Sequence, residues 1–141
     1  MVTGRIRGRQ PVASLAALAL LGCAGPSPDP IAQRPYLVAV DDLDGLPSGT
    51  VEGTLVIERD CVLLEDDEGL LLPLFGAPTA FGPLDGGAPT VDVAGERLRI
   101  GDEVTFEGGT GEISADLRSR YPGVDLTRCG VRRVALLGET R

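Results

Sequence analysis

The side chains able to do chemistry in this 141-residue chain are three cysteines, 21 carboxylates and 13 arginines. The sequence contains no histidine, lysine or tryptophan. Without an imidazole there is no serine–histidine or cysteine–histidine nucleophile pair and no histidine-bound metal. Without a lysine there is no Schiff base and no P-loop. We therefore expect no catalytic residue, cofactor-binding residue or metal ligand. The net charge of −8 also argues against nucleic acid as a partner, because nucleic-acid binders need a basic surface.

Cys23 is the cysteine with the most specific surroundings. Three arginines lie in residues 5–9, and residues 12–21 form an unbroken run of apolar or small side chains. Ten residues are too few to cross a bilayer as a helix, which takes about 20. A basic segment before a short apolar run is typical of a secretory signal peptide. Here the run ends in Leu20-Leu21-Gly22-Cys23.

These four residues resemble a lipobox, the processing site of bacterial lipoproteins. The resemblance implies that residues 1–22 are removed and that Cys23 carries a diacylglycerol and an acyl chain such as palmitate. It also implies an extracytoplasmic protein anchored by lipid to the cell membrane or outer membrane. Two or more acyl chains give stable anchoring, whereas one does not. The alternative is an ordinary secretory signal cleaved after Gly22 or Ala24.

Residues 23–46 read as a lipidated, proline-rich and acidic tether. Residues 24–35 include four prolines, which favours a semi-rigid spacer that reaches roughly 40 Å when extended. The acidic group Asp41, Asp42 and Asp44 is predicted to be a solvated connector, with a weak Ca²⁺ contact as the alternative. Since three arginines and no acid precede Cys23, processing would change the net charge from −8 to −11. We therefore expect lipid, and not charge, to hold the protein at the membrane.

Cys61 and Cys129 remain once Cys23 is assigned to lipid. Export would place them in an oxidising compartment, where a disulfide persists. Their bridge would close a loop of 69 residues, counting both ends, for which chain entropy predicts roughly 4 kcal/mol of stabilisation. A redox-active pair and a two-thiolate metal site are the alternatives, but the sequence has no C-x-x-C spacing and no lysine or histidine that would lower a thiol pKa.

Residues 47–141 alternate apolar and polar side chains between short turns, which predicts strands. The expected strands are 50–58, 61–65, 70–75, 91–93, 97–100, 103–107 and 128–137. Residues 36–40 form either an edge strand or the docked end of the tether. Residues 114–120 form either a short helix capped by Ser114 or a structured loop.

This pattern predicts an all-β fold: a small, closed or partly open antiparallel barrel of about six to seven strands. Closure is favoured because it removes exposed strand edges. The strand count and the helix before the last strand resemble an OB-type barrel.

Three further segments have both a functional and a structural interpretation. The acidic residues 65–68 form either a soluble hairpin tip or a cation or docking site with raised pKa values. The glycine-rich residues 108–111 end a strand in a bulge or turn, or cradle a phosphate. The loop 76–89 offers Phe75, Phe81 and Leu84 as contacts for a ligand or partner, or these residues cover one end of the core.

Two function classes follow. The first is a non-catalytic binding or structural module of the cell envelope, which contacts an envelope protein or polymer. The second is an envelope hydrolase that uses carboxylates or a bound metal.

Overall fold

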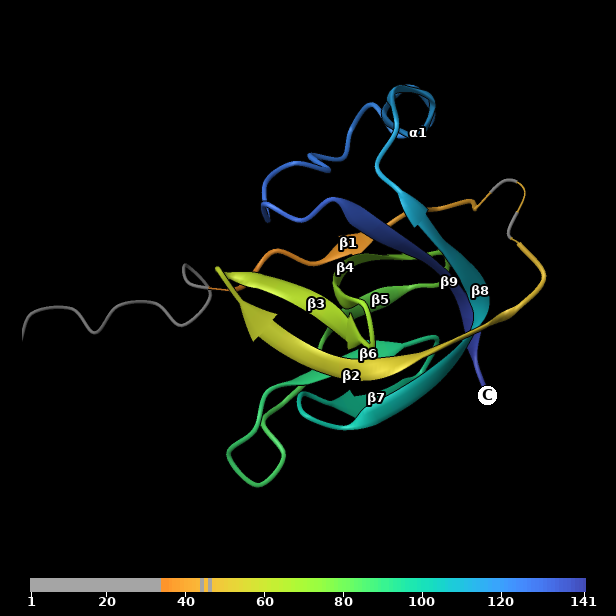
Figure 1. Ribbon diagram of the computed structural model, residues 1–141. Coiled ribbons are helices and arrows are strands. Elements are labelled where there is room, and N and C mark those ends of the chain that lie inside the picture. Colours follow the sequence, from red (N-terminus) through yellow and green to blue (C-terminus); the bar gives the residue numbers. More distant parts are fainter. Residues whose placement is uncertain (1–33, 44, 46) are drawn as a thin grey trace, which may run out of the picture.

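Five strands close into a barrel in the computed structural model, which describes residues 34–43, 45 and 47–141 (Figure 1). In order around the barrel they are β4 (Gly69–Phe75), β3 (Cys61–Asp66), β2 (Thr50–Glu58), β8 (Glu103–Glu112) and β9 (Arg133–Thr140). Neighbouring strands are antiparallel except β4 and β9, which pair in parallel and close the barrel. The predicted all-β barrel is confirmed, and its closing parallel pair departs from the antiparallel expectation.

A second sheet lies over one end of the barrel. It contains β5 (Thr79–Phe81), β6 (Thr90–Val93) and β7 (Glu96–Arg99) in that order. The prediction of an irregular loop over residues 76–89 is therefore wrong for β5, which pairs with β6. Val91, Val93 and Leu98 of this sheet pack into the same apolar cluster as the barrel interior.

Strand β1 (Val38–Ala39) pairs in parallel with β4, and its Val38 is only 4% exposed. Both interpretations of residues 36–40 therefore hold, since the segment is an edge strand and is docked on the barrel. The folded part begins ahead of residue 47 for this reason.

Strands β3 and β4 are apolar on both faces because both faces are covered. Leu64 and Leu71 point into the barrel core, whereas Leu63, Leu72 and Leu74 belong to a second, outer cluster. This explains why their sequences are nearly continuous apolar runs and do not alternate.

The outer cluster is closed by residues 113–132, which we call the covering segment. It contains helix α1 (Ala115–Arg120), where the Ser114 hydroxyl accepts a hydrogen bond from the Leu117 amide at 3.1 Å. The predicted helix is thus confirmed. Leu117, Leu126 and Cys129 are the buried side chains of the segment. Strand β9 begins only at Arg133, and not at residue 128 as predicted, because residues 128–132 belong to this cover.

Strand β8 continues through the glycines that were expected to end it. Its register with β9 shifts between Phe106 and Gly108, so the predicted bulge is confirmed while the predicted end at residue 107 is wrong. A β-carbon on Gly108 would lie 1.9 Å from the carbonyl oxygen of Leu136. The glycine therefore permits close approach of two paired strands and does not break them.

Candidate functional site

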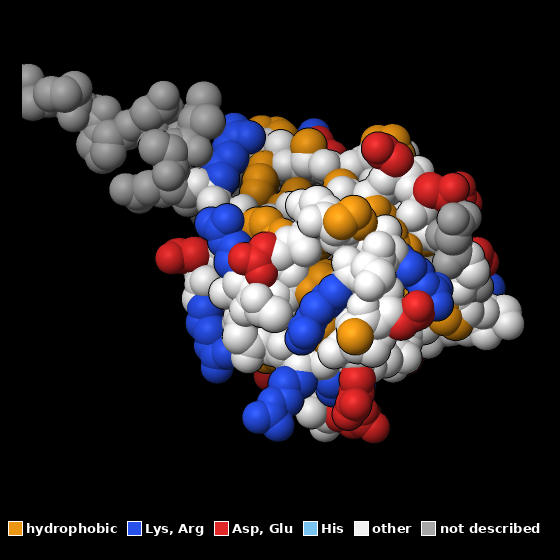
Figure 2. All heavy atoms as spheres, turned by 90° about the horizontal axis from the view of Figure 1, so that it is seen from above, with side chains coloured by type: hydrophobic (Ala, Val, Ile, Leu, Met, Phe, Trp, Pro, Cys, Tyr) orange, Lys and Arg blue, Asp and Glu red, His pale blue; other side chains and the backbone are white. Residues whose placement is uncertain are grey.

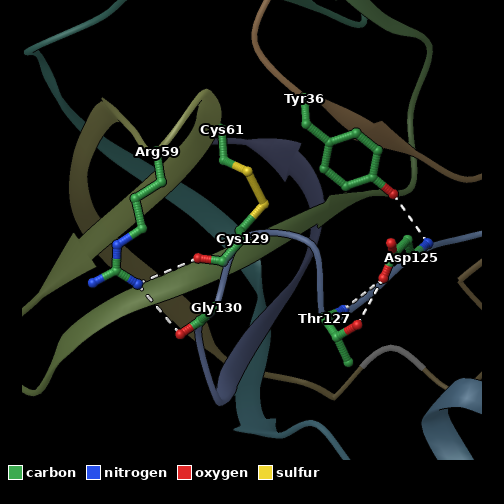
Figure 3. The surroundings of a disulfide bond; sticks show 7 residues. All are labelled: Tyr36, Arg59, Cys61, Asp125, Thr127, Cys129 and Gly130. Carbon is green, nitrogen blue, oxygen red and sulfur yellow. Dashed lines mark hydrogen bonds between the residues drawn. A yellow bond between two sulfur atoms is a disulfide. The ribbon is translucent and has the colours of Figure 1, made fainter.

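A disulfide joins the covering segment to the barrel. Cys61, at the start of β3, is bonded to Cys129, and both residues are buried (Figure 3). The Arg59 guanidinium donates from Nη1 to the carbonyl oxygens of Cys129 at 3.4 Å and Gly130 at 3.3 Å. The predicted Cys61–Cys129 pairing is thus present, with Cys129 in the covering segment and not in the last strand.

The chain enters the folded domain beside this disulfide. The Tyr36 amide donates to the Asp60 carbonyl at 2.6 Å, and the Tyr36 carbonyl accepts from the Val62 amide at 2.9 Å. The Tyr36 hydroxyl accepts from the Asp125 amide at 3.1 Å (Figure 3). The Arg128 guanidinium carbon lies 4.7 Å from the centre of the Tyr36 ring. Tyr36 therefore fixes the start of the domain to both β3 and the covering segment.

One mouth of the barrel is an acidic groove of about 600 Å³. Six carboxylate residues and one arginine line it together with small and hydroxyl residues: Glu52, Gly53, Thr54, Glu65, Asp66, Asp67, Glu68, Glu103, Thr110 and Arg133. The acidic turn 65–68 thus lies beside residues of β2, β8 and β9 that are far from it in the sequence.

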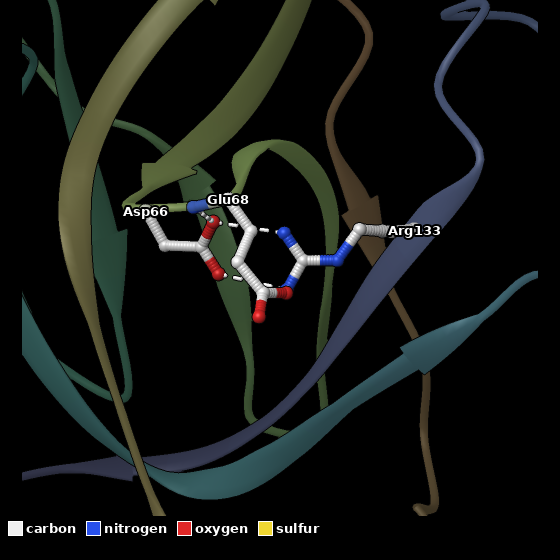
Figure 4. Close-up of polar contacts among 3 residues, drawn as sticks. All are labelled: Asp66, Glu68 and Arg133. Atoms are coloured by element: carbon white, nitrogen blue, oxygen red, sulfur yellow. Dashed lines mark hydrogen bonds and ion pairs between the residues drawn. The ribbon is translucent and has the colours of Figure 1, made fainter.

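Arg133 is the cation of this acidic mouth (Figure 4). Its guanidinium binds both carboxylate oxygens of Asp66, at 2.8 and 2.9 Å, and also one of Glu68 at 2.7 Å. The side chains of Arg133 and Asp66 are 22% and 18% exposed, against 76% for Glu68. Arg133 begins β9 and reaches this mouth, whereas the neighbouring Arg132 lines a different hollow.

The electrostatics of the mouth follow from this contact. The Arg133 hydrogen bonds hold the pKa of the Asp66 carboxyl below its ordinary value of 3.8, against the opposing effect of desolvation. Asp66 in turn raises the pKa of Arg133. The idea that repulsion raises pKa values in the acidic turn is therefore wrong for Asp66, because an arginine from a distant strand reaches it.

The three contact residues proposed around the loop 76–89 have different places. Phe75 is fully buried and packs edge-to-face on Phe106 with 5.7 Å between ring centroids, so its proposed role as a partner contact is wrong. Phe81 is half-buried against the core. Leu84 is 70% exposed. The buried Thr90 hydroxyl donates to the Pro83 carbonyl at 2.7 Å and fixes the base of this loop.

A second, smaller hollow of about 290 Å³ lies between the end of β8 and the covering segment. Arg118 and Arg132 line it, with Glu112, Ile113, Thr127 and Val131. No pattern in the sequence predicted this hollow. Its only signal was the excess of arginine over acid in residues 118–132, which holds four arginines and one aspartate.

Other predicted features are partly outside the described residues. Cys23, the signal segment and Asp44 of the calcium alternative all lie there. Within residues 34–43, 45 and 47–141, no group of three or more His, Cys, Asp or Glu residues is placed to hold a metal ion. In the same part of the chain, no helix has the length and apolar character needed to cross a membrane.

Comparison of the chain with protein-family models, curated proteins and solved structures finds no match.

Proposed function

We propose that the chain is a bacterial lipoprotein in which a lipid on Cys23 tethers a small acidic β-barrel to the outer side of a membrane. The observation that carries this proposal is the order of features at the N-terminus: basic residues, a short apolar run and then Leu20-Leu21-Gly22-Cys23. The spacer that follows leads to Tyr36, which fixes the start of the folded domain.

The disulfide supports export. Disulfides persist in oxidising compartments and are rare in the cytosol. The Cys61–Cys129 bond joins residues with a sequence separation of 68 and lies inside the outer apolar cluster. This is the arrangement of a structural staple, and it supports the structural interpretation over a redox-active pair, which must be accessible to its partner.

We further propose that the barrel is a non-catalytic module that binds an envelope protein or polymer. A five-stranded barrel with this closure resembles an OB-type barrel, a fold that presents one sheet face and its loops to ligands. The exposed Leu84 and the acidic mouth are the surfaces that support binding.

The lowered pKa of Asp66 argues against this carboxyl as the general acid of a hydrolase. A carboxyl that acts as a general acid needs a raised pKa, so that it still holds a proton near neutral pH. Arg133 lowers the pKa of Asp66, which keeps this carboxylate ionised.

The anchor is tested by comparing the wild-type chain with Cys23→Ser in the bacterium that makes it. We expect wild-type protein in the detergent phase of a detergent–water separation and Cys23→Ser in the aqueous phase. Mass analysis of the N-terminal peptide should show acyl chains on the wild type. Wild-type protein in the aqueous phase, or an unmodified Cys23 peptide, would refute the lipoprotein proposal.

The binding module is tested by capture from solubilised envelope with wild-type and Leu84→Asp protein. Deleting the loop 76–89 would remove β5, so a point change in the exposed Leu84 is the cleaner variant. The comparison variant, which is the control for the loop, is Thr54→Asp in the acidic mouth, the other candidate binding surface. One envelope component recovered with wild type and control, and lost with Leu84→Asp, would support the loop as the contact. Loss with Thr54→Asp alone would move the contact to the mouth.

A further inference from the structure

The described arginines divide into two groups by their partners. Ion pairs with carboxylates are formed by Arg97, Arg120, Arg133 and Arg141. Within the described part of the chain, six others form no ion pair, and four of these six belong to the covering segment or donate to its backbone: Arg59, Arg118, Arg128 and Arg132. We call these four the arginine face. Acids outnumber arginines in this chain, so exposed arginines without an acidic partner indicate an anion from outside the chain.

The side chains of the arginine face are exposed, and contacts within the protein restrict the conformations of two of them. Arg59 is held by the carbonyl oxygens of Cys129 and Gly130, and Arg128 by the ring of Tyr36. Arg118 and Arg132 line the hollow of about 290 Å³ beside Thr127. Two guanidinium groups on one hollow suit a phosphate group, which they can bind through several N–H donors.

Of the acids close to these arginines, two already have partners. Asp116 pairs with Arg120 at 2.5 Å, and the Asp125 carboxylate accepts hydrogen bonds from the amide and hydroxyl of Thr127. Glu112 lines the hollow, and Asp60 follows Arg59 in the β2–β3 turn. Figure 2, which looks down on the molecule from above the view of Figure 1, shows arginine side chains on this face together with aspartate and glutamate side chains.

The tether joins the domain at the same place. Tyr36, the residue over which Arg128 lies, is bonded to the backbone of Asp60 and Asp125. Residues 24–35 span at most roughly 40 Å from Cys23 to this point. A lipid on Cys23 would therefore keep the arginine face within roughly 40 Å of the headgroups, so the tether permits contact between them. In Figure 1 the loop between β5 and β6, which carries Leu84, lies at the other end of the molecule from α1.

Resting on the lipid anchor proposed above, we propose that the arginine face lies against the anionic headgroups of the anchoring membrane, with a lipid phosphate between Arg118 and Arg132. The net charge of the processed chain does not prevent this. Charges more than about 8–10 Å from the membrane are screened at physiological ionic strength, so the side chains nearest the surface decide the interaction. The Leu84 loop then points away from the membrane, toward soluble or polymeric partners.

The orientation is tested with single tryptophans, because the natural chain has none. The lipidated chain carries either Ser119→Trp on α1 or Leu84→Trp on the distal loop. Each protein is reconstituted into vesicles of phosphatidylglycerol and phosphatidylcholine that contain a lipid with a nitroxide on its headgroup. We expect strong quenching of Ser119→Trp and weak quenching of Leu84→Trp. Equal quenching of both, or the same result in vesicles of phosphatidylcholine alone, would overturn the proposal.

The headgroup contact is tested apart from the anchor, with unlipidated residues 23–141 carrying Cys23→Ser, because residues 1–22 contain three arginines and an apolar run that could bind vesicles themselves. We expect this protein to float with phosphatidylglycerol vesicles at about 0.15 M salt, where the carboxylates far from the membrane are screened, and not with phosphatidylcholine vesicles. Each arginine near an anionic surface contributes about fivefold, so Arg118→Gln with Arg132→Gln should weaken the partition about 30-fold. The control pair, Arg97→Gln with Arg99→Gln on β7, removes the same charge from the distal sheet and should change it less than fivefold.

The lipid anchor and the headgroup contact can be refuted independently of each other. No flotation by the unlipidated chain, or equal losses for the two arginine pairs, refutes the headgroup contact even when Cys23 is lipidated. An unmodified Cys23 with arginine-dependent flotation refutes the anchor and leaves the headgroup contact in place.

Discussion

The disulfide is the contact whose removal tests the architecture most directly. The change is Cys61→Ala with Cys129→Ala in the full chain carrying Cys23→Ser, which keeps lipid out of solution measurements. The bridge spans a separation of 68 residues, and the chain-entropy relation for a loop of this length predicts a loss of about 4 kcal/mol. Small domains have only about 5–15 kcal/mol of stability in total, so the variant should be close to the limit of folding.

The assay is urea unfolding followed by circular dichroism. With a slope of about 1–3 kcal/mol per molar urea, a loss of about 4 kcal/mol lowers the midpoint by roughly 1.5–4 M. Hydrogen exchange gives the local result. We expect the amide of Leu117 in α1 to lose protection first, because the covering segment is held by the disulfide and only a few buried side chains.

The control is the reduced protein with both cysteines in place, which separates loss of the bond from loss of the buried sulfur atoms. A loss below about 1 kcal/mol in both proteins would refute the reasoning. It would show that packing of the covering segment on β3 and β4 suffices without the covalent link. Uniform loss of protection, with no earlier opening at Leu117, would show that this segment and the barrel unfold as one unit.

Two further predictions concern the acidic mouth and the loop residues. Arg133→Gln should destabilise the fold by about 2 kcal/mol at pH 7, because Asp66 keeps its charge and loses its bidentate partner. The folded state lowers the pKa of Asp66 from 3.8, so the stabilisation by this ion pair is present above about pH 4 and is lost as the pH falls below it. The free energies of unfolding of wild type and Arg133→Gln, measured from pH 7 to pH 2, should therefore converge. Phe75→Ala should destabilise by about 3–5 kcal/mol because it empties a fully buried site, whereas Leu84→Ala should change stability by less than about 0.5 kcal/mol, as measured by thermal unfolding.

Each of these has an outcome that contradicts it. A stability difference between wild type and Arg133→Gln that stays constant down to pH 2 would mean that the arginine acts through packing and not through the carboxylate. Asp66→Asn removes the carboxylate in place of the arginine. Its free energy of unfolding should likewise converge with that of wild type as the pH falls to 2. Similar effects of Phe75→Ala and Leu84→Ala would contradict the assignment of one to the core and the other to the surface.

Much of the barrel could be predicted because its signals are local. The strand of residues 50–58 and the helix before the last strand follow from alternation and from the Ser114 cap, both of which act within a few residues. The hairpin between β6 and β7 follows from its turn at Ala94 and Gly95, which both have positive φ. Strand ends were less predictable, since Gly108 reads as a terminator and serves as a point of close contact with β9.

The candidate surfaces were predictable only in part. Asp66 continues the inward phase of Val62 and Leu64, so a place at the barrel mouth follows from alternation. Its partner Arg133 lies 67 residues away, and no local pattern identifies it. Phe75 failed as a contact residue for a similar reason, because its burial depends on Phe106 from a strand on another part of the chain.

The sequence by itself determined the strand-rich class, the pairing of Cys61 with Cys129 once Cys23 is set aside, and the expectation of a lipid anchor. These depend on composition, on period-two alternation and on residue order over short stretches. Only the tertiary structure decided how β4 and β9 close the barrel and which acids meet Arg133. It also decided that Arg59 donates to the covering segment, that Arg128 lies over Tyr36, and that Arg118 and Arg132 line one hollow. The physical reason is that such contacts join residues far apart in the chain, and the folding of the whole barrel brings them within reach.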